Sequence, residues 1–200
     1  MQSGRLSGMR CYLIGAMDRV KDSGTGWREY ITPFLRERSV VVLNPCDKPI
    51  SVGHESTEDR KRRHRLKYNR RWAQLQREIR LLRVVDLRLV DMSDFLICNL
   101  DTSIHACGTY EELFWANRLK RPILIHCEQG KQGLPDWLFG VFPHQFFFDS
   151  WCQLKNYLKR IHTSKSLNHY KRWMFFDYWR LTPEGQESYF DSKGCDKCPT

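Results

Sequence analysis

The chain has 200 residues, of which 41% are hydrophobic and 13% aromatic, enough for one domain with a substantial core. It has no apolar run of about eighteen residues, the length that a transmembrane helix needs, so no membrane association is expected. The polar start MQSGRLSGMR has no apolar segment of the kind that directs secretion, and we expect a cytoplasmic protein with reduced cysteines. A formal net charge of +10 favours an anionic partner, although solvated basic helix faces would produce the same excess.

Short apolar runs in the first quarter of the chain predict a parallel sheet. We expect residues 1–8 to be a disordered leader, because Met9 directly precedes the first predicted strand, 11–15. A helix carrying Trp27 follows, and then a second, β-branched strand at 40–43. Strand, helix and strand within about thirty-five residues form a βαβ unit, whose two strands are parallel.

The loop between the first strand and its helix, AMDRVKDSGTG, is rich in Gly, Asp and Ser. Its amides from Gly24 to Gly26, together with Arg28 and the helix N-terminus, are candidate contacts for a phosphate or another anion. The loop lacks the spacing of a phosphate-binding loop or a dinucleotide fingerprint, so a plain glycine turn is the alternative.

A long basic insertion follows a polar loop, and we predict one or two helices at about 58–83. Its apolar face would consist of Leu66, Trp72, Leu75, Ile79 and Leu82. The basic segment 60–83 is a candidate nucleic-acid contact, with Tyr68 and Trp72 available for stacking. The alternative is a solvated amphipathic helix that packs on the sheet or on a second subunit, and the absence of a recognised nucleic-acid module favours it.

The middle of the chain predicts a strand at 95–98 that runs to Asp101, a Gly108-Thr109 turn with a capping hydroxyl, and a helix. A carboxylate on the first turn of that helix, Glu111 or Glu112, would lie where open α/β sheets bind ligands. The densest set of chemically capable side chains is acidic: Asp86, Asp91, Asp94, Asp101, Glu111 and Glu112. Paired carboxylates support nucleophilic and acid–base chemistry at a sugar carbon, whereas the missing GxSxG motif argues against acyl transfer.

The last third of the chain predicts strands at 122–126 and 145–148, a helix at 151–161 and an aromatic extension at 163–200. Cys195-x-x-Cys198 has no second ligand pair nearby, and the histidines show no HExxH spacing. We therefore predict no metal and no cofactor.

Several motifs follow one another along the chain: CYLIGAM, a glycine-containing loop into GWREYI, VVLNP, DLRLVDMSDFLICNLD, GTYEELFWA and RPILI. In this order the chain resembles the nucleoside 2-deoxyribosyltransferase-like family, which includes nucleotide N-glycoside hydrolases. The resemblance covers about residues 10–160 and implies an α/β domain at 9–162, with a Rossmann-like or flavodoxin-like parallel sheet and helices on both faces. The basic helical insertion and the C-terminal extension are additions to it.

The resemblance also implies roles for individual residues. The family's nucleophile lies four residues after the Gly and ten before the Pro of the next strand, which selects Glu112 over Glu111. Asp86 lies twenty-six residues upstream and matches the aspartate that contacts the nucleobase and supports proton transfer.

Further residues match positions that surround the substrate in this family. Tyr12 matches an aromatic residue near the nucleophile, Gly15 matches the glycine that ends the first strand, and Gly108 with Thr109 opens the nucleophile's motif. Many members carry Asp or Ser five or six residues before the nucleophile to hold sugar hydroxyls, where this chain has Ala106 and Cys107. Asp101 or His105 would substitute.

The activity implied by the resemblance is N-glycosyl transfer or hydrolysis on a nucleoside or nucleotide, by double displacement through a glycosyl-enzyme on Glu112. One alternative is a glycosyl-transferring enzyme that acts on nucleic acid or a nucleotide-sugar. Another is a non-catalytic nucleotide- or nucleic-acid-binding protein. The family commonly completes its site with a neighbouring subunit, so the resemblance implies a homo-oligomer.

Overall fold

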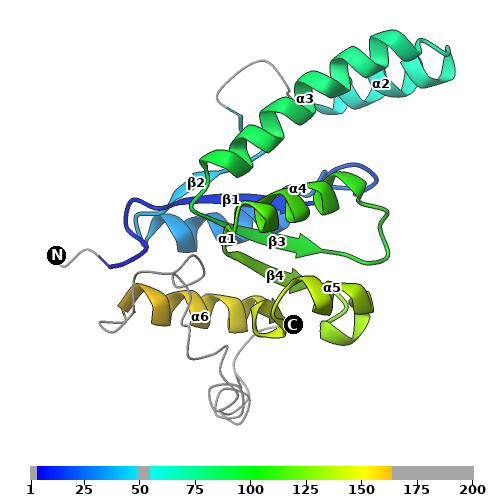
Figure 1. Cartoon of the computed structure of the whole chain (residues 1–200). Coiled ribbons are helices and arrows are strands. Elements are labelled where there is room, and N and C mark those ends of the chain that lie inside the picture. Colours follow the sequence, from blue (N-terminus) through cyan, green and yellow to red (C-terminus); the bar gives the residue numbers. More distant parts are fainter. Residues whose placement is uncertain (1–3, 49–54, 164–200) are drawn as a thin grey trace.

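The protein is a three-layer α/β structure, described here from a computed structural model over residues 4–48 and 55–163 (Figure 1). Its five strands form one parallel sheet in the order β2-β1-β3-β4-β5. They are β1 (Arg10–Gly15), β2 (Val41–Leu43), β3 (Phe95–Leu100), β4 (Ile123–Cys127) and β5 (Phe147–Phe148). This order is that of flavodoxin-like folds, which confirms the predicted fold class.

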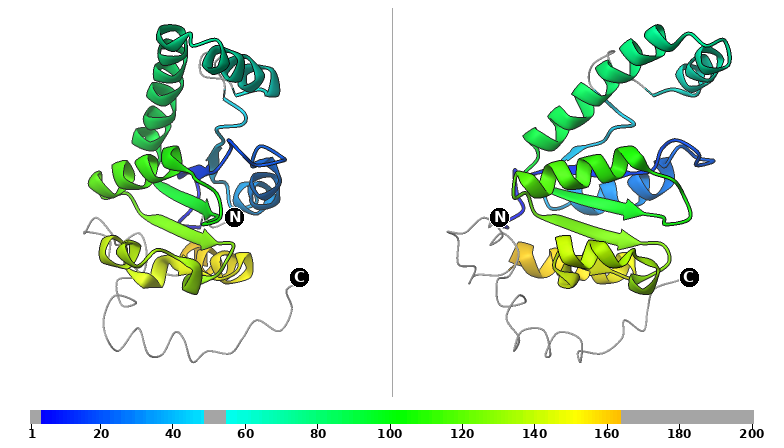
Figure 2. Two further views of the ribbon diagram at one scale, coloured as in Figure 1. Left: turned by 90° about the vertical axis from the view of Figure 1, so that its right-hand side faces the viewer. Right: turned by 45° about the vertical axis from the view of Figure 1, so that its right-hand side comes forward.

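Helices cover both faces of the sheet (Figure 2). They are α1 (Thr25–Arg36), α2 (Thr57–Tyr68), α3 (Trp72–Met92), α4 (Cys107–Arg118), α5 (Asp136–Val141) and α6 (Trp151–Thr163). Single 3₁₀ turns lie at Lys131–Gly133 and His144–Phe146. Apolar side chains of α1 and α6 pack on one face of the sheet, and those of α3, α4 and α5 pack on the other.

Successive side chains of the central strands enter the two cores alternately. In β1, Cys11 and Leu13 belong to the α1/α6 core, whereas Tyr12 and Ile14 belong to the α4 core. Every residue of β3 is buried, as expected for a parallel strand that is covered on both faces. Tyr12 therefore points toward α4, and this direction brings it into the site described below.

The basic insertion forms two helices that extend away from the sheet as a helical arm, defined here as α2 with the first half of α3, residues 57–82 (Figure 1). From Leu82, the last residue of the arm, α3 returns to the core, where Leu82, Asp86 and Val90 are buried on one helical face. The prediction of helices is confirmed, but the end predicted at residue 83 is wrong, because α3 continues without a break to Met92. Trp72 is also not on the buried face, since it is 60% exposed.

The N-terminal segment is more ordered than its composition suggests. Leu6 is fully buried in the α1/α6 core, and the backbone N–H of Arg5 donates to the carbonyl of His162 at 3.1 Å. The predicted disorder through residue 8 is therefore wrong for residues 4–8, because a single leucine in a polar stretch shows no periodic pattern. The C-terminal extension is predicted at 163–200, but Thr163 is the last residue of α6; the rest of the extension, with Cys195 and Cys198, lies outside the described residues.

The expectation of reduced cysteines holds only in part. Cys11, Cys46, Cys98, Cys107 and Cys127 are free thiols, but Cys152 is disulfide-bonded, so the expectation is wrong for that residue. Within residues 4–48 and 55–163, no helix is long and apolar enough to cross a membrane.

Candidate active site

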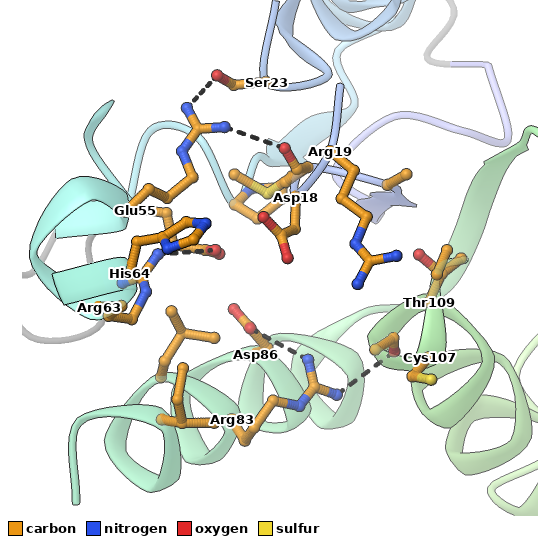
Figure 3. A pocket seen from close by; sticks show the side chains of 18 of the residues that line it. Asp18, Arg19, Ser23, Glu55, Arg63, His64, Arg83, Asp86, Cys107 and Thr109 are labelled. Atoms are coloured by element: carbon orange, nitrogen blue, oxygen red, sulfur yellow. Dashed lines mark hydrogen bonds and ion pairs between the residues drawn. The ribbon is translucent and has the colours of Figure 1, made fainter. Parts of the chain in front are cut away.

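A pocket of about 1240 Å³ opens where β1 and β3 send their following helices to opposite faces of the sheet. Open α/β sheets bind ligands at such a switch point, beyond the carboxyl ends of the strands. The loop after β1, the arm, α3 and the start of α4 all contribute to its walls (Figure 3). The carboxylates of Asp86 and Glu112 reach it from α3 and α4.

Glu112 lies on the second turn of α4 and is 6% exposed. Its Oε1 accepts hydrogen bonds from the Tyr12 hydroxyl at 3.2 Å and from Arg83 Nη1 at 3.1 Å. Burial raises the pKa of this carboxyl to about 7, and the negative charge of Asp86 adds to the rise, while Arg83 and the Tyr12 hydrogen bond oppose it. Near neutral pH both protonation states of Glu112 are therefore populated.

Asp86 is 3% exposed and lies between two cations. Its Oδ2 is 3.3 Å from Arg83 Nη1, and its Oδ1 is 2.7 Å from Lys48 Nζ. Lys48 Nζ lies a further 3.6 Å from Glu55 Oε1. Glu112, Arg83, Asp86, Lys48 and Glu55 thus form a row of alternating charges, an arrangement that makes their burial tolerable because each carboxylate faces a cation.

The two neighbouring glutamates of α4 have different surroundings. Arg83 Nη2 is 2.8 Å from Glu111, whose side chain is 53% exposed and lies outside the pocket lining. Glu112 is buried and lines the pocket. The distinction drawn from the sequence motif therefore corresponds to a difference in burial, although the catalytic role of Glu112 stays a prediction.

Arg28 fixes the loop after β1. It is 1% exposed, and its guanidinium donates to the carbonyls of Leu13 at 3.2 Å, Gly24 at 2.6 Å and Gly15 at 3.0 Å. Gly24 has φ +71°, and a Cβ there would lie 2.4 Å from the Ala16 carbonyl oxygen, so the loop requires glycine at this position.

The predicted anion contacts of this loop have internal partners. The amides of Gly24 and Gly26 donate to the carboxylate of Asp22 at 2.9 and 2.8 Å, and neither glycine lines the pocket. Arg28 does line the pocket. In this structure Asp22 occupies the place that a bound anion would take on those two amides.

The structure brings some of the other predicted residues to the pocket, namely Gly15, His105, Gly108 and Thr109. Asp101 is not among them, because its carboxylate accepts hydrogen bonds from Ser103 and from Gln129 Nε2 instead. The predicted cap is wrong: Gly108 and Thr109 lie inside the first turn of α4, and the N-cap residue Ala106 has no side-chain cap. Cys107 Sγ lies 3.0 Å from His105 Nε2.

Sequence reasoning missed the cations of the site, Arg83, Lys48 and Arg60. Arg60 of α2 donates to the carbonyl of Met17 at 3.1 Å and to the Ser23 hydroxyl, and so ties the arm to the loop after β1. Arg83 precedes Asp86 by three residues, a spacing that places both on one helix face, but thirty-three Lys and Arg residues in the chain offer many such pairs. Over residues 4–48 and 55–163, no cluster of His, Cys, Asp and Glu could hold a metal ion.

No protein-family model matches the sequence, and no curated protein matches it. Among the solved structures that the fold resembles is a 2-deoxyribosyltransferase from Bacillus psychrosaccharolyticus, with a TM-score of 0.49, 16% identity, and coverage of 74% of this chain and 91% of that chain. A CMP N-glycosidase from Clostridium botulinum gives a TM-score of 0.42, 15% identity, and coverage of 75% and 98%. A 2-desoxiribosyltransferase from Leishmania mexicana gives 0.41, 17%, and coverage of 91% and 96%. These are the kinds of enzyme that the sequence motifs resemble, and at such identities the similarity concerns the fold.

Proposed function

We propose that the protein is an enzyme that breaks or transfers the N-glycosidic bond of a nucleoside or nucleotide, with Glu112 as its nucleophile. The observation that carries the proposal is a buried carboxylate at the pocket, held by the Tyr12 hydroxyl and Arg83 and adjacent to Asp86. These residues include the ones for which the sequence resembles the deoxyribosyltransferase-like family.

The geometry of Glu112 suits a nucleophile in a double displacement. Tyr12 and Arg83 both bind Oε1, which leaves Oε2 as the attacking atom. Oε2 forms an ester with C1′ of the sugar while the C1′–N bond breaks and its electron pair leaves with the base. Water or a second base then attacks C1′ and releases the carboxylate, which gives hydrolysis or transfer respectively.

Asp86 is proposed to orient the base and to assist the arrival of a proton at the departing nitrogen. Its ion pairs with Lys48 and Arg83 fix the position of the carboxylate in the pocket. The proton comes from solvent, since the pocket is open, so the first step releases a neutral base.

The lining of the pocket favours a phosphorylated substrate over a neutral nucleoside. It contains nine Lys and Arg residues against four Asp and Glu residues. A cleft with this excess of positive charge raises the local concentration of anions.

A second candidate function is nucleotide binding without turnover. It is favoured by the absence of a carboxylate where the family holds sugar hydroxyls: Ala106 and Cys107 take that place, and Asp101 bonds elsewhere.

One assay separates the two functions. The purified protein is incubated with ribo- and deoxynucleosides and with their 5′-monophosphates, with and without a free acceptor base, and base release is followed by chromatography. Glu112→Gln should abolish release, whereas Glu111→Gln, which removes the neighbouring exposed carboxylate, should retain it. Rapid acid quenching should leave a glycosyl adduct on the peptide that contains Glu112. Undiminished release by Glu112→Gln would exclude this nucleophile, and saturable binding without release would favour the second function.

A further inference from the structure

The charge of the protein is concentrated in one short part of the arm. Residues 60–71, which comprise most of α2 and the turn to α3, contain eight Lys and Arg residues and no Asp or Glu. The net charge of this segment is therefore +8, compared with +10 for the whole chain. A general solvated surface would distribute this excess, so the concentration indicates a local polyanionic partner.

Most of these cations are not used to hold the arm together. Arg62 pairs with Asp59 at 2.9 Å and with Glu78 at 3.2 Å, and Arg63 lies 3.7 Å from Glu55. Five others have no ion pair with any residue of 4–48 or 55–163: Lys61, Arg65, Lys67, Arg70 and Arg71. Like charges at helical spacing repel and destabilise an isolated helix, and a bound polyanion would relieve that repulsion.

Two aromatic side chains at the tip of the arm lack a packing role. Tyr68 is 88% exposed and Trp72 is 60% exposed, and all residues from 67 to 74 are exposed. Aromatic rings placed among Lys and Arg are the usual platform on which unpaired bases stack, because every base has a π-face.

The pocket connects this tip to the proposed nucleophile. Lys61, Arg65 and Tyr68, spaced i, i+4 and i+7 on one face of α2, all line it. Along α3 the lining runs from Asp86 to Leu75, about 16 Å at 1.5 Å per residue. With about 1240 Å³ the cavity exceeds the roughly 300–1,000 Å³ of ordinary small-molecule sites, so it has room for more than one nucleotide.

From these observations we infer that the arm binds single-stranded nucleic acid, with bases stacked at Tyr68 and Trp72 and the strand running along α2 toward Glu112. A single strand is favoured over a duplex because only unpaired bases present free faces to the tip, and because enzymes that act on a nucleotide must take it out of the stack. This inference rests on the proposed function. If both hold, the substrate is a nucleotide within a strand or at its end.

The test measures binding by fluorescence anisotropy with labelled 15-nucleotide DNA and RNA strands and the matching duplex, at several salt concentrations. The full chain is used with Glu112→Gln, so that no turnover interferes. The triple variant Lys61→Ala/Arg65→Ala/Lys67→Ala removes three positive charges that line the pocket and have no ion pair in the described residues. The double variant Tyr68→Ala/Trp72→Ala removes the two aromatic rings at the tip of the arm. Arg77→Ala/Arg88→Ala/Arg118→Ala is the matched control, since it removes three exposed charges outside the pocket.

The variant that lacks Lys61, Arg65 and Lys67 should weaken single-strand binding at least tenfold. The slope of log binding constant against log salt concentration should become less negative by about two, at roughly 0.7 per phosphate contact. The tip variant should weaken binding about tenfold with an unchanged salt slope. Circular dichroism should show the same helix content in all variants, because the replaced side chains are exposed. Comparing the DNA and RNA strands identifies which of the two the arm prefers.

No strand binding, equal losses in the matched control, or equal affinity for the duplex would each overturn the inference. Base release from free nucleotides without strand binding would leave the proposed function intact and exclude the role of the arm. Strand binding without base release from any substrate would support the arm and reject the proposed activity.

Discussion

Replacing Glu112 with Gln should stabilise the fold increasingly as pH rises, although it removes the proposed nucleophile. Burial holds the folded-state pKa of this carboxyl at about 7, compared with 4.5 for an ordinary glutamate. Between these values the folded protein holds a proton that the unfolded chain has lost, so the stability of the wild type falls as pH rises through this window. The difference between 4.5 and about 7, at 1.36 kcal/mol per pH unit, amounts to roughly 3 kcal/mol of stability, which is present below about pH 4.5 and is lost by about pH 7.

Glutamine does not titrate, so the variant lacks this loss. The free energy of unfolding of Glu112→Gln relative to wild type should therefore shift in favour of the variant by up to about 3 kcal/mol between pH 5 and pH 8. Urea titrations of both proteins at four pH values measure this difference, provided that the two proteins have the same m-value. The contributions of other titrating groups are the same in both proteins and cancel in the difference. Glu111→Gln should change stability by less than about 1 kcal/mol, as expected for an exposed ion pair. A Glu112→Gln difference that is constant over this pH range would refute the buried, pKa-raised carboxyl on which the proposed mechanism depends.

Three further predictions concern the partners of Glu112 and the N-terminal segment. The kcat/KM of base release by the wild type should rise as pH increases through about 7, as Glu112 loses its proton. Arg83→Gln should move this rise to higher pH, because Arg83 lowers the pKa of Glu112. A rise at unchanged pH would show that Arg83 does not affect the ionisation of the nucleophile. Tyr12→Phe should lower kcat at pH 7 about tenfold by removing one hydrogen bond to the carboxylate, and unchanged kinetics would exclude that role. Leu6→Ala should reduce the free energy of unfolding by about 2–5 kcal/mol in urea, whereas a loss below about 1 kcal/mol would mean that residues 4–8 do not pack as described.

The sheet could be predicted from sequence because its central strands are short apolar runs, covered on both faces. Phe95–Leu100 is buried at every position, and such a run between turn signals has few other interpretations in a βαβ chain. β5 was predicted two residues too long, since Gln145 and Phe146 are buried in a 3₁₀ turn and burial alone does not distinguish the two conformations.

Half of the site could also be predicted, because its motif is local. Gly108, Thr109 and Glu112 lie within five consecutive residues of α4, so their spacing can be read directly from the sequence. The cations around Asp86 could not be predicted from the sequence, because Lys48 and Arg83, which both contact Asp86, are thirty-five residues apart in the chain. Nothing in the sequence of the basic insertion distinguishes Arg83, which faces two buried carboxylates, from the arginines that lie in solvent.

The position of Arg83 links the two proposals physically. It lies on α3, the same uninterrupted helix that begins at Trp72 in the exposed tip of the arm and carries Asp86 into the pocket. Arg83 Nη1 contacts both Asp86 and Glu112, so the helix that presents the tip to a strand also sets the electrostatics of the nucleophile. A strand that repositioned α3 by even one ångström would alter the distance on which the pKa of Glu112 depends, because the interaction between two charges varies inversely with their separation.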